Sequence, residues 1–217
     1  MHPRTTGFAL VLMAACFALA PGCKHESAAG PATAEKPRDD TRELIDRLDQ
    51  AGFYRYCETP DAAAQAKRAA LEGRLPIAES VRRTCPMNTE KLARGGAADF
   101  MRSCKSVFGV HGVKLNKIEQ MFVITIGYYV QIDGEEYEIY AEGDTHGLRL
   151  VDLNARGTLT MCNEILRRAG SDERMYMLDA GHEAQAVFLT EEQFRILRDG
   201  APPGCENLKP PDAIGKG

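Results

Sequence analysis

One β-hairpin constrains the fold of this chain more than any other segment. Residues 121–132 and 135–142 alternate between apolar and polar side chains and flank Asp133-Gly134, the dipeptide preferred in a two-residue type I′ turn. That turn fixes a register in which the facing pairs are Ile132 with Glu135, Val130 with Tyr137, Tyr128 with Ile139, and Ile126 with Ala141. One face is then apolar and the other polar, as in an antiparallel sheet that is exposed on one side.

The polar face of this hairpin is the predicted partner-binding surface. We expect it to carry Tyr129, Gln131, Glu136, Glu138 and Tyr140. Aromatic side chains beside carboxylates, without a pocket, are typical of surfaces that recognise proteins. The alternatives are an ordinary solvated sheet face, or a face covered by the helix expected at residues 61–72.

Helical patterns surround the hairpin. Caps and apolar spacing predict helices at 42–51, 61–72, 155–169 and 191–198, and a helical region from Asn88 that breaks at Gly95-Gly96 and resumes at Ala97. Further strands are expected at 174–178 and 186–189. The order of elements predicts one α+β domain over residues 40–217, with an irregular Pro-rich tail. Its small antiparallel sheet would have about four strands in two hairpins, covered by helices on one face.

The first 22 residues have the pattern of an export signal. Arg4 precedes an apolar run at 7–20, which spans about 21 Å as a helix and is too short for a hydrocarbon core of roughly 30 Å. The run ends in Leu19-Ala20-Pro21-Gly22-Cys23, which resembles the lipobox of bacterial lipoproteins. This resemblance implies that residues 1–22 are a signal peptide and that lipid is attached to Cys23. A secreted protein without lipid and an uncleaved anchor are the alternatives.

The residues that follow Cys23 indicate how the domain is held. Residues 23–39 are rich in Ala, Pro, Ser and charge, which predicts a flexible tether. By resemblance to lipoprotein sorting in Gram-negative bacteria, Lys24 in place of Asp implies the outer membrane. Because residues 1–22 contain one charged side chain, Arg4, the mature chain keeps 26 of the 27 basic residues against 31 acidic ones, a net charge of −5. This balance argues against a nucleic-acid partner.

Cysteine usage is compatible with an oxidising compartment. The domain contains Cys57, Cys85, Cys104, Cys162 and Cys205, and no C-x-x-C spacing that would indicate a zinc ribbon or a thioredoxin-like centre. Cys57–Cys85 is the preferred disulfide, since both residues flank one short predicted helix. Cys104 and Cys162 lie on core-facing helical stripes, where a buried free thiol, a disulfide and a nucleophile are the alternatives.

Candidate metal ligands are weak, and catalytic motifs are absent. Asp144 and His146 stand two residues apart in a segment that His182 could complete, but exposed turns are the preferred explanation of these residues. His111, like His182, is expected to be a surface histidine. Since no G-x-S-x-G, H-E-x-x-H or P-loop pattern occurs in the chain, we predict no catalytic residue, no resident metal and no cofactor.

An acidic, tethered, exported domain without a catalytic motif resembles the accessory, inhibitor and immunity lipoproteins of bacteria. The resemblance covers the export signal and the general organisation. It implies a periplasm-facing module, anchored in the outer membrane through its lipid, that captures another envelope or periplasmic protein, such as a toxin or a cell-wall hydrolase. The alternatives are a metal-binding protein or metal-assisted hydrolase, and a structural envelope lipoprotein.

Overall fold

The computed structural model describes residues 39–74, 76–77, 79–123, 127–141, 143, 149–179 and 184–215. Its helices are α1 (Asp39–Gln50), α2 (Pro60–Leu71), α3 (Thr89–Ala93), α4 (Ala97–Val110), α5 (Leu150–Arg168) and α6 (Glu191–Gly200). Its strands are β1 (Thr84–Met87), β2 (Ile118–Val123), β3 (Gly127–Ile132), β4 (Glu135–Ala141), β5 (Glu173–Asp179), β6 (Ala184–Thr190) and β7 (Leu208–Lys209). The α+β class is confirmed. Among the helices of the described segments, none has the length and apolar character to cross a membrane.

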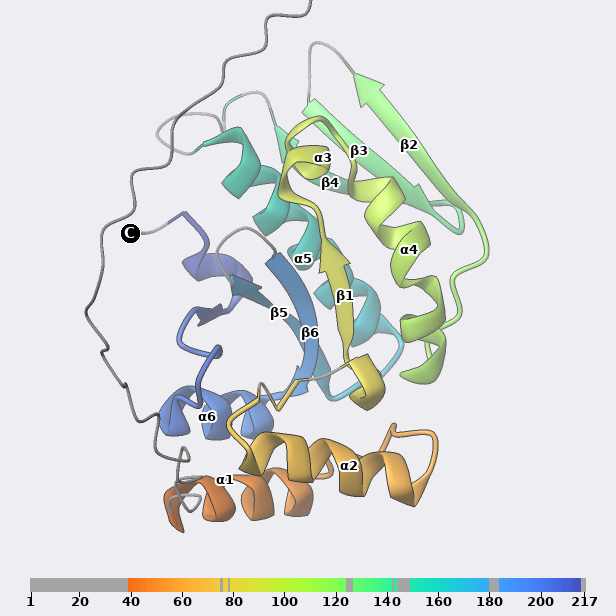
Figure 1. The fold of residues 1–217 in the computed structure, drawn as a ribbon. Coiled ribbons are helices and arrows are strands. Elements are labelled where there is room, and N and C mark those ends of the chain that lie inside the picture. The colour runs from red at the N-terminus through yellow and green to blue at the C-terminus, as the bar shows by residue number, and fades with distance from the viewer. Residues whose placement is uncertain are drawn as a thin grey trace, which may run out of the picture. The chain divides into compact units, whose positions relative to one another are not determined.

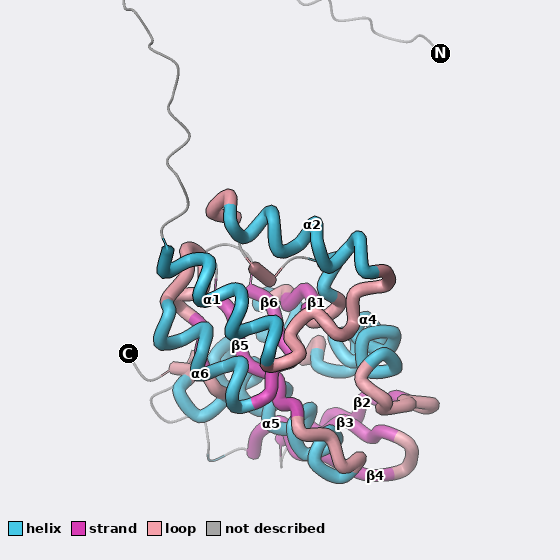
Figure 2. The backbone as a smooth tube through the Cα atoms, turned by 90° about the horizontal axis from the view of Figure 1, so that it is seen from below, coloured by secondary structure: helices cyan, strands magenta, loops and turns pink. Residues whose placement is uncertain are grey.

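A four-stranded antiparallel sheet, in the order β1-β6-β5-β7, lies between two hydrophobic cores (Figure 1). Side chains alternate across it because successive residues of a strand point to opposite faces. Tyr176 and Val187 pack with α1, α2 and α6, whereas Met175 and Phe188 pack with α4 and α5. Figure 2 shows α1 and α6 side by side, with α2 beyond α1. The predicted β5–β6 hairpin is confirmed, but helices cover this sheet on both faces rather than on one.

The second sheet is a three-stranded meander, β2-β3-β4. Its inner face buries Tyr128, Val130 and Ile132. The hydroxyl of Tyr128 accepts from the backbone N–H of Ala97 at 3.0 Å and donates to the carbonyl of Gly95 at 2.7 Å, which ties the sheet to the start of α4. The break in the helical region at Gly95-Gly96 leaves these two backbone groups without helical partners, and the tyrosine satisfies them.

The predicted strand at 121–132 is wrong, because that segment contains parts of two strands. Met121 pairs with Tyr129, so β2 and β3 are antiparallel neighbours. Gly127 opens β3 with φ of 139°, and a Cβ there would lie 2.3 Å from the carbonyl oxygen of Tyr140. Only glycine fits so close an approach. Gly127 therefore marks the start of β3, which cannot be recognised from the continuous apolar pattern of the sequence.

The β3–β4 hairpin has the predicted turn but departs from the predicted register. Asp133 and Gly134 both have positive φ, as a type I′ turn requires, and the pairs from Ile132–Glu135 to Tyr129–Glu138 are as expected. Beyond them a bulge makes Tyr140, not Ile139, the partner of Tyr128. The pairing of Ile126 with Ala141 is also replaced, because Ala141 lies opposite Gly127. The bulge sets the carbonyl of Ile139 against Gly157 of α5, where a Cβ would come within 1.9 Å.

Capping signals in the sequence predict some helix ends correctly and others incorrectly. The capping box at Thr190 and Gln193 is present at the start of α6, as predicted. Helix α5 begins five residues earlier than the predicted 155, at Leu150. The Arg149 side chain donates to Asp152 of the first turn at 2.7 Å, and Leu153 of that turn is already buried.

Strand β1 forms one edge of the four-stranded sheet and was not predicted. It has four residues and contains Pro86. Because proline is uncommon inside strands, the sequence pattern does not indicate a strand here. The backbone N–H of Phe188 donates to the carbonyl of Arg83 at 2.8 Å. Because bonded pairs alternate in an antiparallel ladder, Thr84 and Pro86 direct their backbone groups away from β6.

Candidate functional site

Four of the five predicted binding residues lie together on the outer face of the three-stranded sheet. Tyr129 and Gln131 are half-buried there, and Glu136 and Glu138 are exposed. Two cross-strand rows result, and their members are Met121–Tyr129–Glu138 and Glu119–Gln131–Glu136. We call these six residues the outer sheet face. Glu119 and Met121 were missed because their strand had been merged with the next one.

Tyr140 does not belong to the outer sheet face. Its side chain packs on the hydrophobic core, and its ring meets that of Tyr128 edge-on at 6.0 Å between centroids. The bulge at Ile139 shifts the alternation of β4 by one residue, which turns Tyr140 inward. Helix α2 packs in the other core, beside α1, so the alternative in which residues 61–72 cover this face is not found.

The outer sheet face carries negative charge that is only partly compensated. Glu119 forms an ion pair with Lys117 at 2.9 Å. Glu138 accepts a hydrogen bond from the Tyr129 hydroxyl at 3.0 Å, which raises the pKa of Tyr129. Within the described part of the chain, no basic side chain pairs with Glu136 or Glu138. Their two carboxylates therefore face solvent as net negative charge on a flat surface.

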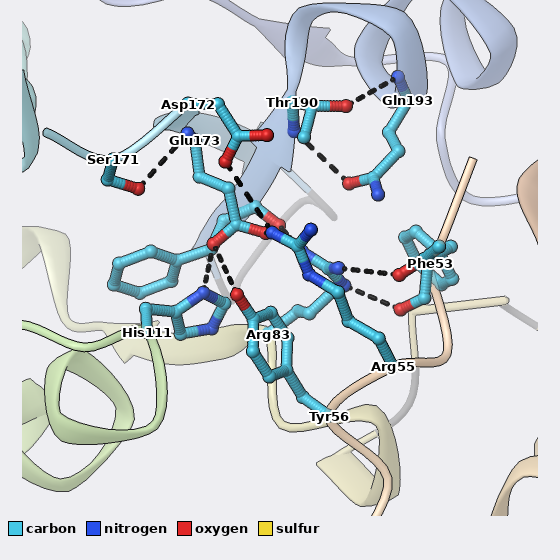
Figure 3. Close-up of polar contacts among 12 residues, drawn as sticks. Phe53, Arg55, Tyr56, Arg83, His111, Ser171, Asp172, Glu173, Thr190 and Gln193 are labelled. Atoms are coloured by element: carbon cyan, nitrogen blue, oxygen red, sulfur yellow. Dashed lines mark hydrogen bonds and ion pairs between the residues drawn. The ribbon is translucent and has the colours of Figure 1, made fainter.

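A buried ionic cluster lies at a different place, where four chain segments meet (Figure 3). At its centre, Glu173 accepts from Arg83 at 2.7 Å and from Arg55 at 2.8 Å through one carboxylate oxygen. The other oxygen contacts His111 Nδ1 and accepts from the Tyr56 hydroxyl at 3.4 Å. The side chains of Arg83, His111 and Glu173 are fully buried. Charges buried so completely require partners of opposite sign.

The remaining polar groups of this cluster are also satisfied. Arg83 donates to the carbonyls of Phe53 at 2.6 Å, Gly52 at 3.1 Å and Phe188 at 2.9 Å. His111 Nε2 lies 3.2 Å from the carbonyl of Arg82, so both ring nitrogens face acceptors. The expectation that His111 is a surface histidine is therefore wrong. No short-range pattern could show this, since the partners of His111 come from sequence positions far from it.

The centre of the ionic cluster is closed to solvent, because the side chains of Arg83, His111 and Glu173 are fully buried. Burial by itself raises the pKa of Glu173, but the hydrogen bonds and charges of His111 and Arg83 outweigh burial, and the pKa falls to about 2. The His111 ring is stacked on Phe188 at 4.3 Å and lies 4.2 Å from the ring of Tyr56. A histidine that is enclosed in this way and bonded at both nitrogens is not available as a general base.

A cleft of about 550 Å³ runs along the free edge of β1, between α2 and α4. Its lining includes Arg82, Thr84, Ser103, Ser106 and Val107. Arg82 has φ of 57°, a left-handed conformation that is uncommon for a residue with a side chain. Its guanidinium lies 3.4 Å from Glu58, which also lines the cleft. The walls are thus mixed, with hydroxyl groups, one ion pair and a few aliphatic side chains.

The other predicted sites have separate outcomes. Asp144, His146 and His182 lie outside the described residues, and within the described ones no three His, Cys, Asp or Glu side chains form a group that could hold a metal ion. Cys57 and Cys85 are both free thiols, as are Cys104, Cys162 and Cys205, so the structure lacks the predicted Cys57–Cys85 disulfide.

Comparison with protein-family models, with curated proteins and with solved structures finds no match to this chain.

Proposed function

We propose that this protein is an exported lipoprotein that captures a basic protein partner on its outer sheet face. In this proposal Cys23 carries the lipid, residues 24–39 connect it to the domain, and the domain works on the periplasmic side of the outer membrane. The partner is another envelope or periplasmic protein, such as a toxin or a cell-wall hydrolase that the domain inhibits.

The observation that carries the proposal is the pair of solvent-facing carboxylates at Glu136 and Glu138, which have no basic partner among the described residues. Like charges placed side by side on a sheet repel one another, so they make the free protein less stable than a neutral pair would. A positively charged partner removes that repulsion and gains association rate from the same field.

The aromatic and apolar members of the face complete a recognition surface. Tyr129 lies between Met121 and Glu138 in the same cross-strand row, with its hydroxyl oriented by Glu138. A half-buried tyrosine presents a large ring at a low cost in side-chain entropy, and such residues are common anchors of protein interfaces. The sheet below is fixed by Tyr128 and the buried core, so the surface is already formed before binding.

The test compares two double variants with the same change in charge. Glu136→Lys/Glu138→Lys inverts the outer sheet face, whereas Glu72→Lys/Glu206→Lys changes two exposed glutamates outside that sheet. Each protein, and a Tyr129→Ala variant, is used to capture partners from periplasmic extract. We expect the wild type and the control to retain the same basic protein, and the outer-face variants to lose it. Equal capture by all four proteins would show that the outer sheet face is not the binding surface.

The anchoring part of the proposal is tested separately. A Cys23→Ser variant is expected to lose incorporation of a labelled fatty acid and to leave the outer-membrane fraction. Retention of label in this variant, or wild-type protein in the cytosolic fraction, contradicts the anchor.

A further inference from the structure

Three cysteine side chains converge in one hydrophobic core. Cys85 comes from β1, Cys104 from α4 and Cys162 from α5, and each is at most 1% exposed. The Cys104 Sγ lies 3.9 Å from the hydroxyl of Ser103, and the neighbouring Cys85 thiol raises the pKa of Cys104. Strand β1 and helix α4 pack against each other, so Cys85 and Cys104 enter the same core from two adjoining elements, as the two halves of a disulfide must.

The third thiol has a different partner. Cys162 Sγ donates to the thioether sulfur of Met101 at 3.4 Å. Cys57 and Cys205 pack with the other core, on the far side of the four-stranded sheet. The packing of β1 on α4 therefore singles out Cys85 and Cys104 among the five thiols.

We propose that Cys85 and Cys104 are a redox pair that forms a disulfide when the chain folds in an oxidising compartment. The inference rests on the export part of the proposed function for its cellular setting. It replaces the Cys57–Cys85 bridge with a different partner for Cys85. The bond would join β1, the edge strand that lines the cleft, to α4, which forms the opposite wall.

The chemistry is thiol–disulfide exchange with an exported dithiol oxidase, or with glutathione disulfide in the test tube. One thiolate attacks the disulfide of the oxidant and forms a mixed disulfide, and the second thiolate displaces the oxidant sulfur. Two electrons pass to the oxidant, which leaves as two thiols after taking up the two protons that Cys85 and Cys104 release.

Burial determines when this exchange can happen. Removal from water raises the pKa of Cys104, and the neighbouring Cys85 raises it further. Because the thiolate is the reacting species, the folded, reduced protein reacts slowly. We therefore expect the bond to form in the unfolded or partly folded chain and then to be protected by the core.

The decisive experiment refolds the purified protein in a glutathione redox buffer after denaturation and full reduction. Remaining thiols are blocked by alkylation, and the protein is digested with trypsin without reduction. Cleavage falls after Arg83, Lys91, Arg102 and Lys105, so peptides 84–91 and 103–105 remain together only if the bond exists. We expect this linked pair, a mass about 2 Da below that of the reduced form since two hydrogens are lost, and no linkage in native reduced protein given the same buffer.

Cysteine variants and a cell fraction separate the possible failures. Cys162→Ala is expected to keep the linked pair and Cys104→Ala to lose it. Refolded wild type with both thiols alkylated, or with Cys85 linked to Cys162, would overturn the redox pair. Because refolding takes place in vitro, this result does not depend on the location of the protein, which the Cys23→Ser fractionation tests by itself. In the envelope fraction, alkylated at lysis, the same linked peptides are expected.

Discussion

Replacing Glu173 by Gln tests whether the buried ionic cluster stabilises the fold through its charge. The carboxylate is 0% exposed and accepts from Arg83, Arg55 and Tyr56 while contacting His111. Its pKa is lowered from the ordinary 4.5 to about 2. A difference of this size between the folded and unfolded states corresponds to about 3 kcal/mol of folding free energy at neutral pH.

The sign of the pH dependence follows from the direction of the shift. Because the pKa of Glu173 is lower in the folded protein, the unfolded chain binds the proton first as the pH falls. The stabilisation is complete above about pH 5 and is lost as the pH drops from 4.5 towards 2. Linkage gives about 3 kcal/mol at pH 7 and about 1 kcal/mol at pH 3.

The assay is urea unfolding of the wild type and of Glu173→Gln, followed by circular dichroism at pH 7, 5 and 3. The neighbouring Asp172→Asn is the matched control, because Asp172 is 71% exposed and its ion pair with Arg55 is long, at 3.5 Å. We expect Glu173→Gln to cost about 3 kcal/mol at pH 7, with the difference from wild type shrinking on acidification, and the control to cost less than about 1 kcal/mol. A Glu173→Gln protein as stable as the control, or a difference that is constant between pH 7 and 3, would refute the reasoning.

Two further changes test how the helices are fixed. Gly157→Ala places a methyl group 1.9 Å from the carbonyl of Ile139 and is expected to lower the free energy of unfolding in urea by about 2 kcal/mol. The control is Gly109→Ala on α4, where the added Cβ meets no atom within 4 Å; it is expected to raise the free energy of unfolding by up to about 1 kcal/mol. Similar free energies for the two variants would contradict the close contact of α5 with β4. Thr190→Ala removes the hydroxyl that accepts from the N–H of Gln193 at 3.2 Å and is expected to cost about 1 kcal/mol, read from the thermal midpoint, whereas an unchanged midpoint would mean that the capping box does not stabilise α6.

The parts of the fold that were predictable from the sequence are those encoded within a few residues. The turn at Asp133-Gly134 and the capping box at Thr190 require only neighbouring side chains, and both are present. The strand boundary at Gly127 and the bulge at Ile139 depend on atoms that are distant in sequence. The first needs Tyr140 close to its Cα, and the second needs the missing side chain of Gly157. Apolar alternation carries no information about either contact.

The residues of the candidate site can also be separated into those that neighbouring residues predict and those that depend on distant contacts. Alternation along β3 was sufficient to place Tyr129 and Gln131 on the outward face. Tyr140 was misplaced because its orientation depends on the bulge. The ionic cluster joins residues 55, 83, 111 and 173, whose charged side chains resemble surface residues in sequence. Glu173, at the start of a strand whose central residues 175–178 are apolar, was the one local signal that a charge enters the core.

Pro86 in strand β1 affects the tendency of copies of this chain to aggregate. A free sheet edge is a template on which an identical chain can add its own strand and so start aggregation. The position of Pro86 on the ladder turns its backbone nitrogen outwards, and proline has no hydrogen there to donate. The edge therefore lacks one of the donors that a second copy would need, which disfavours edge-to-edge polymerisation of this chain.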